Sequence, residues 1–146
     1  MFRIFACLSM VALFAAPALA GEATDAVSFF YQDPGAEYLP ENRTRFTGQM
    51  LDFLNDADAA WERDEINCIS FVFSIDAQDL DLDEITKTLK YDEAVEGERA
   101  VVTAHFANFG QATEIEWTLQ HSGAGWQVSD IASLTNDWRV SSMSCD

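Results

Sequence analysis

The sequence predicts an α+β fold in which helices precede a curved antiparallel sheet. Two observations predict the sheet: apolar and polar residues alternate in two successive segments between Glu98 and Gln120, and the glycine turn 121–125 leads into the run Gly-Trp-Gln-Val-Ser-Asp-Ile. A third predicts helices, because apolar residues recur at spacings of three and four from Phe46 to Trp61. Period two is typical of half-buried strands, and the longer spacing is typical of amphipathic helices.

The N-terminus has the layout of a cleaved export signal. Arg3 gives a basic start, an apolar run covers 4–14, and the small residues Ala18 and Ala20 stand where a signal peptidase reads the chain. We therefore expect cleavage after Ala20.

The mature chain is expected to carry no membrane anchor. The apolar run is shorter than the roughly 20 residues that a membrane-spanning helix needs. Cys7 lies too early in that run to be the lipidated cysteine of a lipoprotein. We expect 1–20 to be removed as a signal peptide and 21–146 to form a single α+β domain that is periplasmic or secreted.

The chain is strongly acidic, with 25 Asp and Glu residues against 8 Lys and Arg residues and a formal charge of −17. Loss of Arg3 with the leader makes the mature charge −18. Nucleic acid and anionic membranes bind clustered Lys and Arg, so neither is an expected partner. A basic protein is the expected class of partner, and the alternative is that the acidity only keeps the protein soluble.

Two cysteines, Cys68 and Cys145, remain after the leader is removed. A pair of cysteines in an exported protein predicts a disulfide, because the compartment oxidises thiols. This bridge would tie the end of the chain to its middle.

Helices are expected in the first part of the mature chain. Thr24 is the expected N-cap of a first helix, which ends at Asp33-Pro34-Gly35. Pro40 opens a second helical region, and its apolar stripe is expected to cover the sheet. The stripe consists of Phe46, Met50, Phe53, Leu54, Ala57 and Trp61.

Strands are expected in the rest of the chain. Alternation of apolar residues predicts short strands within 68–75 and 85–91, and then the longer strands around 100–106 and 115–119. In the last strand, the residues expected to face the core are Trp126, Val128 and Ile131.

Three short motifs resemble those of a known superfamily. They are Phe30-Tyr31 before Asp33-Pro34-Gly35, Asp76-x-Gln78-Asp79, and the run from Gly125 to Ile131. Together with the leader, they are similar to small periplasmic proteins of the nuclear-transport-factor-two-like (SnoaL-like, cystatin-like α+β) superfamily. The resemblance implies a cone-like curved sheet with helices packed on its concave face, sometimes a ligand pocket, and often a homodimer. It implies no single activity, because the members include isomerases, dehydratases and binding domains.

His105 and Asp130 are the candidates for catalysis. A histidine titrates near neutrality and could act as a general base beside an acid, a pair that enzymes of the superfamily use inside the cone. However, His105 alternates with the core residues and is expected on the outer face. Asp130 stands where the strand must bulge if Trp126, Val128 and Ile131 all face inward, and its carboxylate is expected to accept backbone N–H bonds there. We therefore assign neither residue to a catalytic site.

Asp79, Asp81 and Asp83 are the candidates for a metal site, because acids on alternate residues resemble a calcium loop. The segment has Glu84 where such a loop needs glycine and Lys90 where it needs glutamate. We therefore expect an acidic connection without a metal, and no cofactor.

Two functions from different classes remain open. The first is an exported binding or accessory protein, such as an acidic inhibitor or immunity-type protein for a basic partner. The second is a small hydrolase, isomerase or dehydratase that works in a pocket of the cone. We favour binding over catalysis, because the sequence contains no nucleophile or phosphate motif. A filled cone would support the first function, and a large cavity lined by an acid and a base would support the second.

Overall fold

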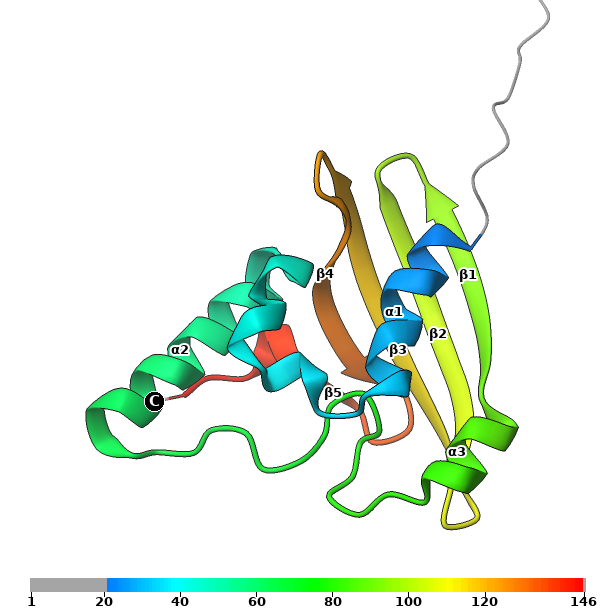
Figure 1. Ribbon diagram of the computed structural model, residues 1–146, viewed down its shortest axis with the longest axis horizontal. Helices are drawn as coiled ribbons and strands as arrows, with labels where there is room; N and C mark the ends of the chain where they lie inside the picture. The colour runs from blue at the N-terminus through cyan, green and yellow to red at the C-terminus, as the bar shows by residue number, and fades with distance from the viewer. Residues whose placement is uncertain (1–20, 146) are drawn as a thin grey trace, which may run out of the picture.

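The computed structural model describes residues 21–145 (Figure 1). The expected signal peptide, its cleavage site and Cys7 lie outside the described residues. In chain order the elements are α1 (Glu22–Gln32), η1 (Ala36–Tyr38), η2 (Pro40–Arg45), α2 (Gly48–Asp64), α3 (Leu82–Thr88), β1 (Lys90–Glu96), β2 (Arg99–Asn108), β3 (Gln111–Ser122), β4 (Gly125–Ser133), β5 (Trp138–Arg139) and η3 (Val140–Ser142). Among these residues, no helix combines the length and the apolar character needed to cross a membrane.

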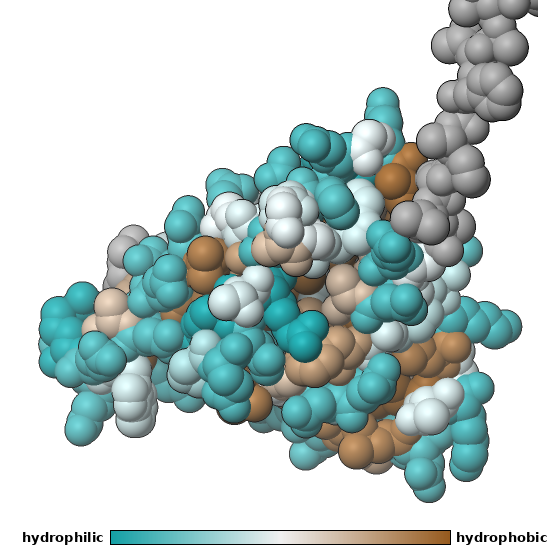
Figure 2. All heavy atoms as spheres, turned by 45° about the horizontal axis from the view of Figure 1, so that its top comes forward, coloured by the Kyte–Doolittle hydropathy of each residue, from teal (hydrophilic) through white to brown (hydrophobic). Residues whose placement is uncertain are grey.

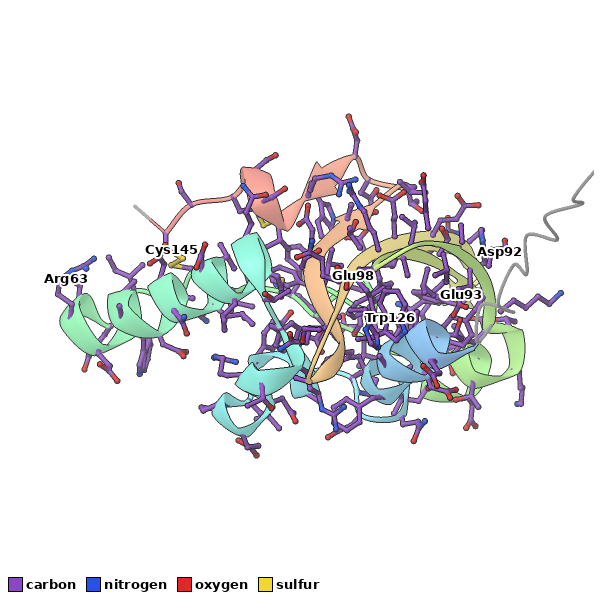
Figure 3. All side chains as sticks on the ribbon, turned by 90° about the horizontal axis from the view of Figure 1, so that it is seen from above. Arg63, Asp92, Glu93, Glu98, Trp126 and Cys145 are labelled. Atoms are coloured by element: carbon purple, nitrogen blue, oxygen red, sulfur yellow. A yellow bond between two sulfur atoms is a disulfide. The ribbon has the colours of Figure 1, made fainter. Side chains whose placement is uncertain are left out.

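The strands form one antiparallel sheet in the order β1-β2-β3-β4-β5, so each strand pairs with its neighbour in the sequence. The sheet curves strongly, and α1 lies inside the curve (Figures 1 and 3). This arrangement confirms the predicted α+β fold class. Two-residue turns connect the first four strands, and both residues of the β2–β3 turn, Phe109 (φ 50°) and Gly110 (φ 76°), have the left-handed backbone that such hairpins require.

The predicted alternation of β2 and β3 is confirmed. Val102 and Trp117 are paired across the two strands and are completely buried on the concave face. The ring of Phe30 from α1 stacks on Trp117 with centroids 5.2 Å apart and an interplanar angle of 14°. The indole Nε1 of Trp117 donates a hydrogen bond of 3.2 Å to the hydroxyl of Tyr31. Helix α1 therefore supplies the side chains that fill the curve of the sheet.

Glu93 of β1, and not Thr24, caps the first helix. The helix begins at Glu22 after Gly21. The carboxylate of Glu93 accepts hydrogen bonds from the backbone nitrogens of Gly21 (2.9 Å) and Thr24 (2.7 Å) and from the Thr24 hydroxyl (2.7 Å). Partial burial alone would raise the pKa of Glu93, but these hydrogen bonds outweigh it and lower the pKa.

Helix α2 does not cover the concave face as expected. Phe46 forms a parallel bridge with Val128 of β4, and the helix then runs outward, past the edge of the sheet (Figure 1). Met50 and Leu54 of its apolar stripe are completely buried, but Trp61 is 57% exposed. Ala60 is only 2% exposed, so the buried face of the helix continues through Ala57 to Ala60 and leaves Trp61 beside it.

The two short predicted strands, within 68–75 and 85–91, are largely wrong. Segment 68–75 has no regular strand, and its only ladder contact within the described chain is an isolated bridge between Val72 and Ala77. Most of the second segment is α3, which continues to Thr88 before β1 begins. Ile85 and Leu89 are four residues apart, a spacing that suits one helix face as well as one strand face.

Strand β4 bulges where predicted. Thr118 pairs with Asp130 and Leu119 pairs with Val128, so Ser129 is left out of the register. The extra residue lets both Val128 and Ile131 reach the core, where they are buried. Trp126 is only half-buried, which corrects its assignment to the core. It packs edge-on against His121, with centroids 5.0 Å apart.

The predicted disulfide between Cys68 and Cys145 is confirmed, with Cα atoms 5.5 Å apart. It joins the segment that follows α2 to the end of the chain (Figure 3).

Candidate functional site

Side chains fill the concave face of the sheet, where a pocket in the cone would lie. Phe30 lies between Trp117 and Phe46, with centroid distances of 5.2 Å and 5.3 Å. All three rings are at most 1% exposed. Next to these rings, Tyr31 packs edge-on against Phe106 and Trp117. Sites for a ligand or partner must therefore be sought on the outside of the molecule.

His105 lies on the outer face of β2, as expected, and is flanked by two acids. Its Nδ1 lies 3.3 Å from Oε1 of Glu114, the residue directly opposite on β3. Its Nε2 lies 3.0 Å from Oδ2 of Asp92 without the alignment of a hydrogen bond. Figure 3 shows Asp92 outside the curved sheet and Glu93 inside it, beside α1.

The structure does not bring Asp130 to His105. The carboxylate of Asp130 accepts bonds from the backbone nitrogens of Ile131 and Ser141, both at 3.0 Å, and from the Ser141 hydroxyl at 2.7 Å. Nη1 of Arg139 donates a further bond of 3.0 Å, and Nη2 of the same guanidinium bonds Glu116 at 2.8 Å. These two carboxylates raise the pKa of Arg139. Asp130 thus joins β4 to the end of the chain through contacts within the protein.

The three candidate metal ligands do not converge. Asp81 caps α3 by accepting a 3.0 Å bond from the backbone nitrogen of Glu84. Asp83 is exposed in the first turn of that helix, where a negative charge is favourable. Asp79 contributes its backbone carbonyl to the amide of Asn108. Within residues 21–145 no group of three or more His, Cys, Asp or Glu side chains could hold a metal ion.

An outward-facing groove of about 550 Å³ lies between α2 and segment 66–72. We call it the Trp61 groove. Trp61 and Ile66, at 57% and 44% exposure, are large apolar side chains that the fold leaves in solvent. The groove is lined by Tyr38, Ala57, Asp58, Trp61, residues 66–72 and Gln78.

Segment 66–72, which forms one wall of this groove without regular secondary structure, is fixed by contacts at several points. The Tyr38 hydroxyl donates to the carbonyl of Phe71 and accepts a 2.7 Å bond from the backbone nitrogen of Phe73. The Gln78 amide donates a 2.8 Å bond to the carbonyl of Ser70. The disulfide fixes the wall again at Cys68. The segment is therefore ordered by side chains instead of by a strand ladder.

A buried carboxyl group holds the chain just after this wall, at Ser74. Glu37 is completely buried, and its Oε1 accepts bonds from the backbone nitrogen (3.1 Å) and the hydroxyl (3.0 Å) of Ser74. Loss of hydration in this position raises the pKa of Glu37 although these hydrogen bonds oppose the shift.

Asp76 is a second polar anchor after Glu37, and it joins its own segment to the last strands of the sheet. Its carboxylate accepts bonds of 2.6 Å from each of Ser133, Asn136 and the indole of Trp138. It has a left-handed backbone, with φ 60°.

Sequence reasoning missed the Trp61 groove, Glu37 and Asp76. One signal pointed to the groove: Trp61 is followed by the charged run Glu62-Arg63-Asp64-Glu65, which is unusual for a helix end that is buried. Glu37 and Asp76 carry no comparable signal, because their partners are distant in the sequence.

The fold and these surfaces define a small α+β protein with a filled curved sheet and an outward-facing groove. No family model and no curated protein sequence matches the chain. The resemblance to the nuclear-transport-factor-two-like superfamily is therefore not confirmed.

Solved structures similar to this chain do exist. The chain is similar to one in the type VI effector-immunity complex Tae3-Tai3 from Ralstonia pickettii. In the selenomethionine crystal, the TM-score is 0.52 at 16% identity, over 77% of this chain and 96% of that chain. In the native crystal, the corresponding values are 0.51 and 17%, over 76% and 93%. At this identity the likeness shows a shared fold.

A phospholipid-binding protein from Ralstonia solanacearum is also similar at 14% identity, over 83% of this chain and 67% of that chain. Its TM-score of 0.37 is too low to indicate a common fold.

Proposed function

We propose that this chain is an exported, immunity-type protein that binds a basic partner protein and neutralises it. The observation that carries the proposal is the filled concave face. The stacked rings of Phe30 and Trp117 occupy the space that an enzyme of this shape would give to its substrate. The exposed apolar side chains of α2 and of the segment after it lie outside, where only another macromolecule would cover them.

The shared fold with a chain of an effector-immunity complex supports an immunity-type role. The charge of the chain supports a basic partner, because the formal charge is −17 and acids are exposed on α2 and on β1 alike. Such a surface attracts an oppositely charged protein over the about 8 Å that screening allows at 0.15 M salt. Binding should therefore be fast at low salt and weaken as salt rises.

The disulfide supports the exported location. Bridges of this kind persist in oxidising compartments and are rare in the cytosol. The bridge between Cys68 and Cys145 therefore suits a protein that works in the periplasm or outside the cell.

A co-expression screen tests the proposal. Fragments of the source genome are exported to the periplasm of a host, with and without this protein in the same compartment. We expect at least one fragment to be toxic alone and tolerated when the protein is present. Its product should be basic, should co-purify with the protein, and should dissociate in a salt gradient.

The control is an unrelated periplasmic protein of similar size and negative charge. Equal protection by that control, or the absence of any protected fragment, would refute the immunity function. Turnover of a small substrate that is lost in His105→Ala while the fold is retained would favour the enzyme instead.

A further inference from the structure

We infer that the Trp61 groove is the surface on which the basic partner docks. This inference rests on the proposed function and names its binding site. The occupant is a segment of the partner that carries an Arg or Lys beside an apolar side chain. The cation lies over the indole of Trp61, and the apolar side chain enters the groove beside Ile66.

The exposure of Trp61 is the first observation. A tryptophan that is 57% exposed leaves a large apolar ring in water, although Ala57, one turn earlier on the same helix, is only 7% exposed. Tryptophan is enriched among the residues that dominate protein interfaces. Ile66 adds a second apolar side chain, at 44% exposure, on the opposite side of the groove.

The charge around Trp61 identifies the chemistry of the partner. Asp58 and Asp64 are each three residues from Trp61 and therefore neighbour it on the helix surface, and Glu65 caps the end of the helix directly after them. Helix α2 as a whole has five acidic residues and one basic residue, a net charge of −4. In Figure 2 the α2 end of the molecule, at the left, is covered mostly by hydrophilic residues.

Two of these acids already have partners. Asp58 binds the guanidinium of Arg43 at 2.8 Å, and Asp64 binds Arg63 at 2.5 Å. Among residues 21–145 no ion pair engages Glu65. The negative end of the α2 dipole lies at the same place. A cation over the indole face would be attracted by the ring, by Glu65 and by the helix end together.

The wall of the groove is prepared for binding. The disulfide at Cys68, the Tyr38 hydroxyl and the Gln78 amide hold segment 66–72 in place before a partner arrives. Binding to a surface that is already ordered avoids most of the entropy cost of ordering a loop. The groove therefore has an apolar anchor, an acidic rim and a fixed wall.

The test uses a defined probe, a synthetic amphipathic peptide of Leu and Arg residues. Its matched control has Glu in place of each Arg. Each peptide is titrated into the ¹⁵N-labelled mature protein with the disulfide intact. We expect the basic peptide to shift the Trp61 indole signal and the amides of 66–72, and the acidic peptide to shift neither.

The first variant is Trp61→Ala, which should raise the Kd of the basic peptide at least about 30-fold if Trp61 is a dominant contact. The second is Asp64→Lys with Glu65→Lys, and its control is Asp92→Lys with Glu114→Lys. Both pairs change the net charge equally, but the control lies on the outer face of the sheet. Figure 3 shows Arg63, beside the first pair, and Asp92 at opposite ends of the molecule. We expect a large loss of affinity from the first pair and a small loss from the control.

Equal losses from the two pairs would overturn the inference, because net charge alone would then explain binding. Peptide-induced shifts on the outer face, or none in the groove, would also overturn it. If Trp61→Ala does not fold, the affinity of Trp61→Phe for the peptide and the peptide-induced shifts of the unmodified protein still test whether the groove binds it.

The same variants separate this inference from the proposed function. If the toxic fragment of the screen is neutralised equally well by Trp61→Ala and by the Asp64 and Glu65 pair, the immunity function stands and the docking site is wrong. If the peptide maps to the groove but no fragment is protected, the docking site stands and the immunity function fails.

Discussion

Replacing both Cys68 and Cys145 by serine should lower the free energy of unfolding by about 2 to 4 kcal/mol, with an upper value near 4.5 kcal/mol. The upper value follows from the loop that the bridge closes. The two cysteines are 77 positions apart. In the chain-entropy model, a loop of this length restricts the unfolded chain by roughly 15 cal/mol/K, which is about 4.5 kcal/mol at 25 °C.

Urea titration followed by tryptophan fluorescence measures this loss. The slope of free energy against urea should rise in the double variant, because its unfolded chain is free to expand. Unmodified protein treated with a reductant should match the double variant. Ser144→Ala is the control for a change in the chain end, since Ser144 is exposed next to Cys145.

A loss of less than about 1 kcal/mol in the free energy of unfolding, both in the double variant and in the reduced unmodified protein, would refute the reasoning. It would mean that the reduced chain end and segment 66–72 are restrained in the unfolded state by something other than the bridge.

Three further predictions concern single residues, each measured by urea unfolding. Trp117→Ala should cost about 3 to 5 kcal/mol because Trp117 is completely buried, whereas Trp126→Ala should cost about 1 to 2 kcal/mol because Trp126 is half-buried; equal costs would contradict the assigned burial. Asp76→Ala should cost at least about 3 kcal/mol, because it leaves three donors without their charged acceptor, and a change within about 0.5 kcal/mol would show that the anchor is dispensable. Burial raises the pKa of Glu37, so the folded state holds this proton more tightly than the unfolded state does; the resulting stability is present below the unfolded pKa of about 4.3 and is lost as pH rises through the folded pKa. Glu37→Gln should remove this part of the pH dependence above the unfolded pKa of about 4.3, and an unchanged profile would show that another group causes it.

Local patterns predicted most of the sheet. Alternation is set by the strand itself, so the buried faces of β2 and β3 could be assigned from residues such as Val102 and Trp117. The bulge near Asp130 followed from the same rule, because three apolar residues could share a face only if one residue was left out. Two cysteines after an expected export signal sufficed to predict the bridge.

Contacts between distant segments could not be predicted in this way. Glu93 caps a helix whose first residues are 69 and 72 positions away, so nothing near Thr24 indicates the cap. The buried site of Glu37 depends on Ser74, 37 positions later.

The sequence did not predict the candidate site, for a related reason. The spacing of Trp61 fits the apolar stripe, but the buried face of α2 passes through Ala57 and Ala60, and Trp61 lies beside that face in solvent. For this reason a residue that sequence periodicity assigned to the interior became the main surface candidate.

The order of the strands along the sheet has a consequence for how the chain folds. Because β1 to β4 are joined by two-residue turns and each pairs within the sheet with its neighbours in the sequence, the contacts between these strands have low contact order and can form before the rest of the chain is placed. Cys145 stands at the opposite extreme, one residue from the end of the chain. In the sequence it follows every strand of the sheet. The bridge from Cys68 to Cys145 therefore fastens, at the last step, a topology that the hairpins can already have set.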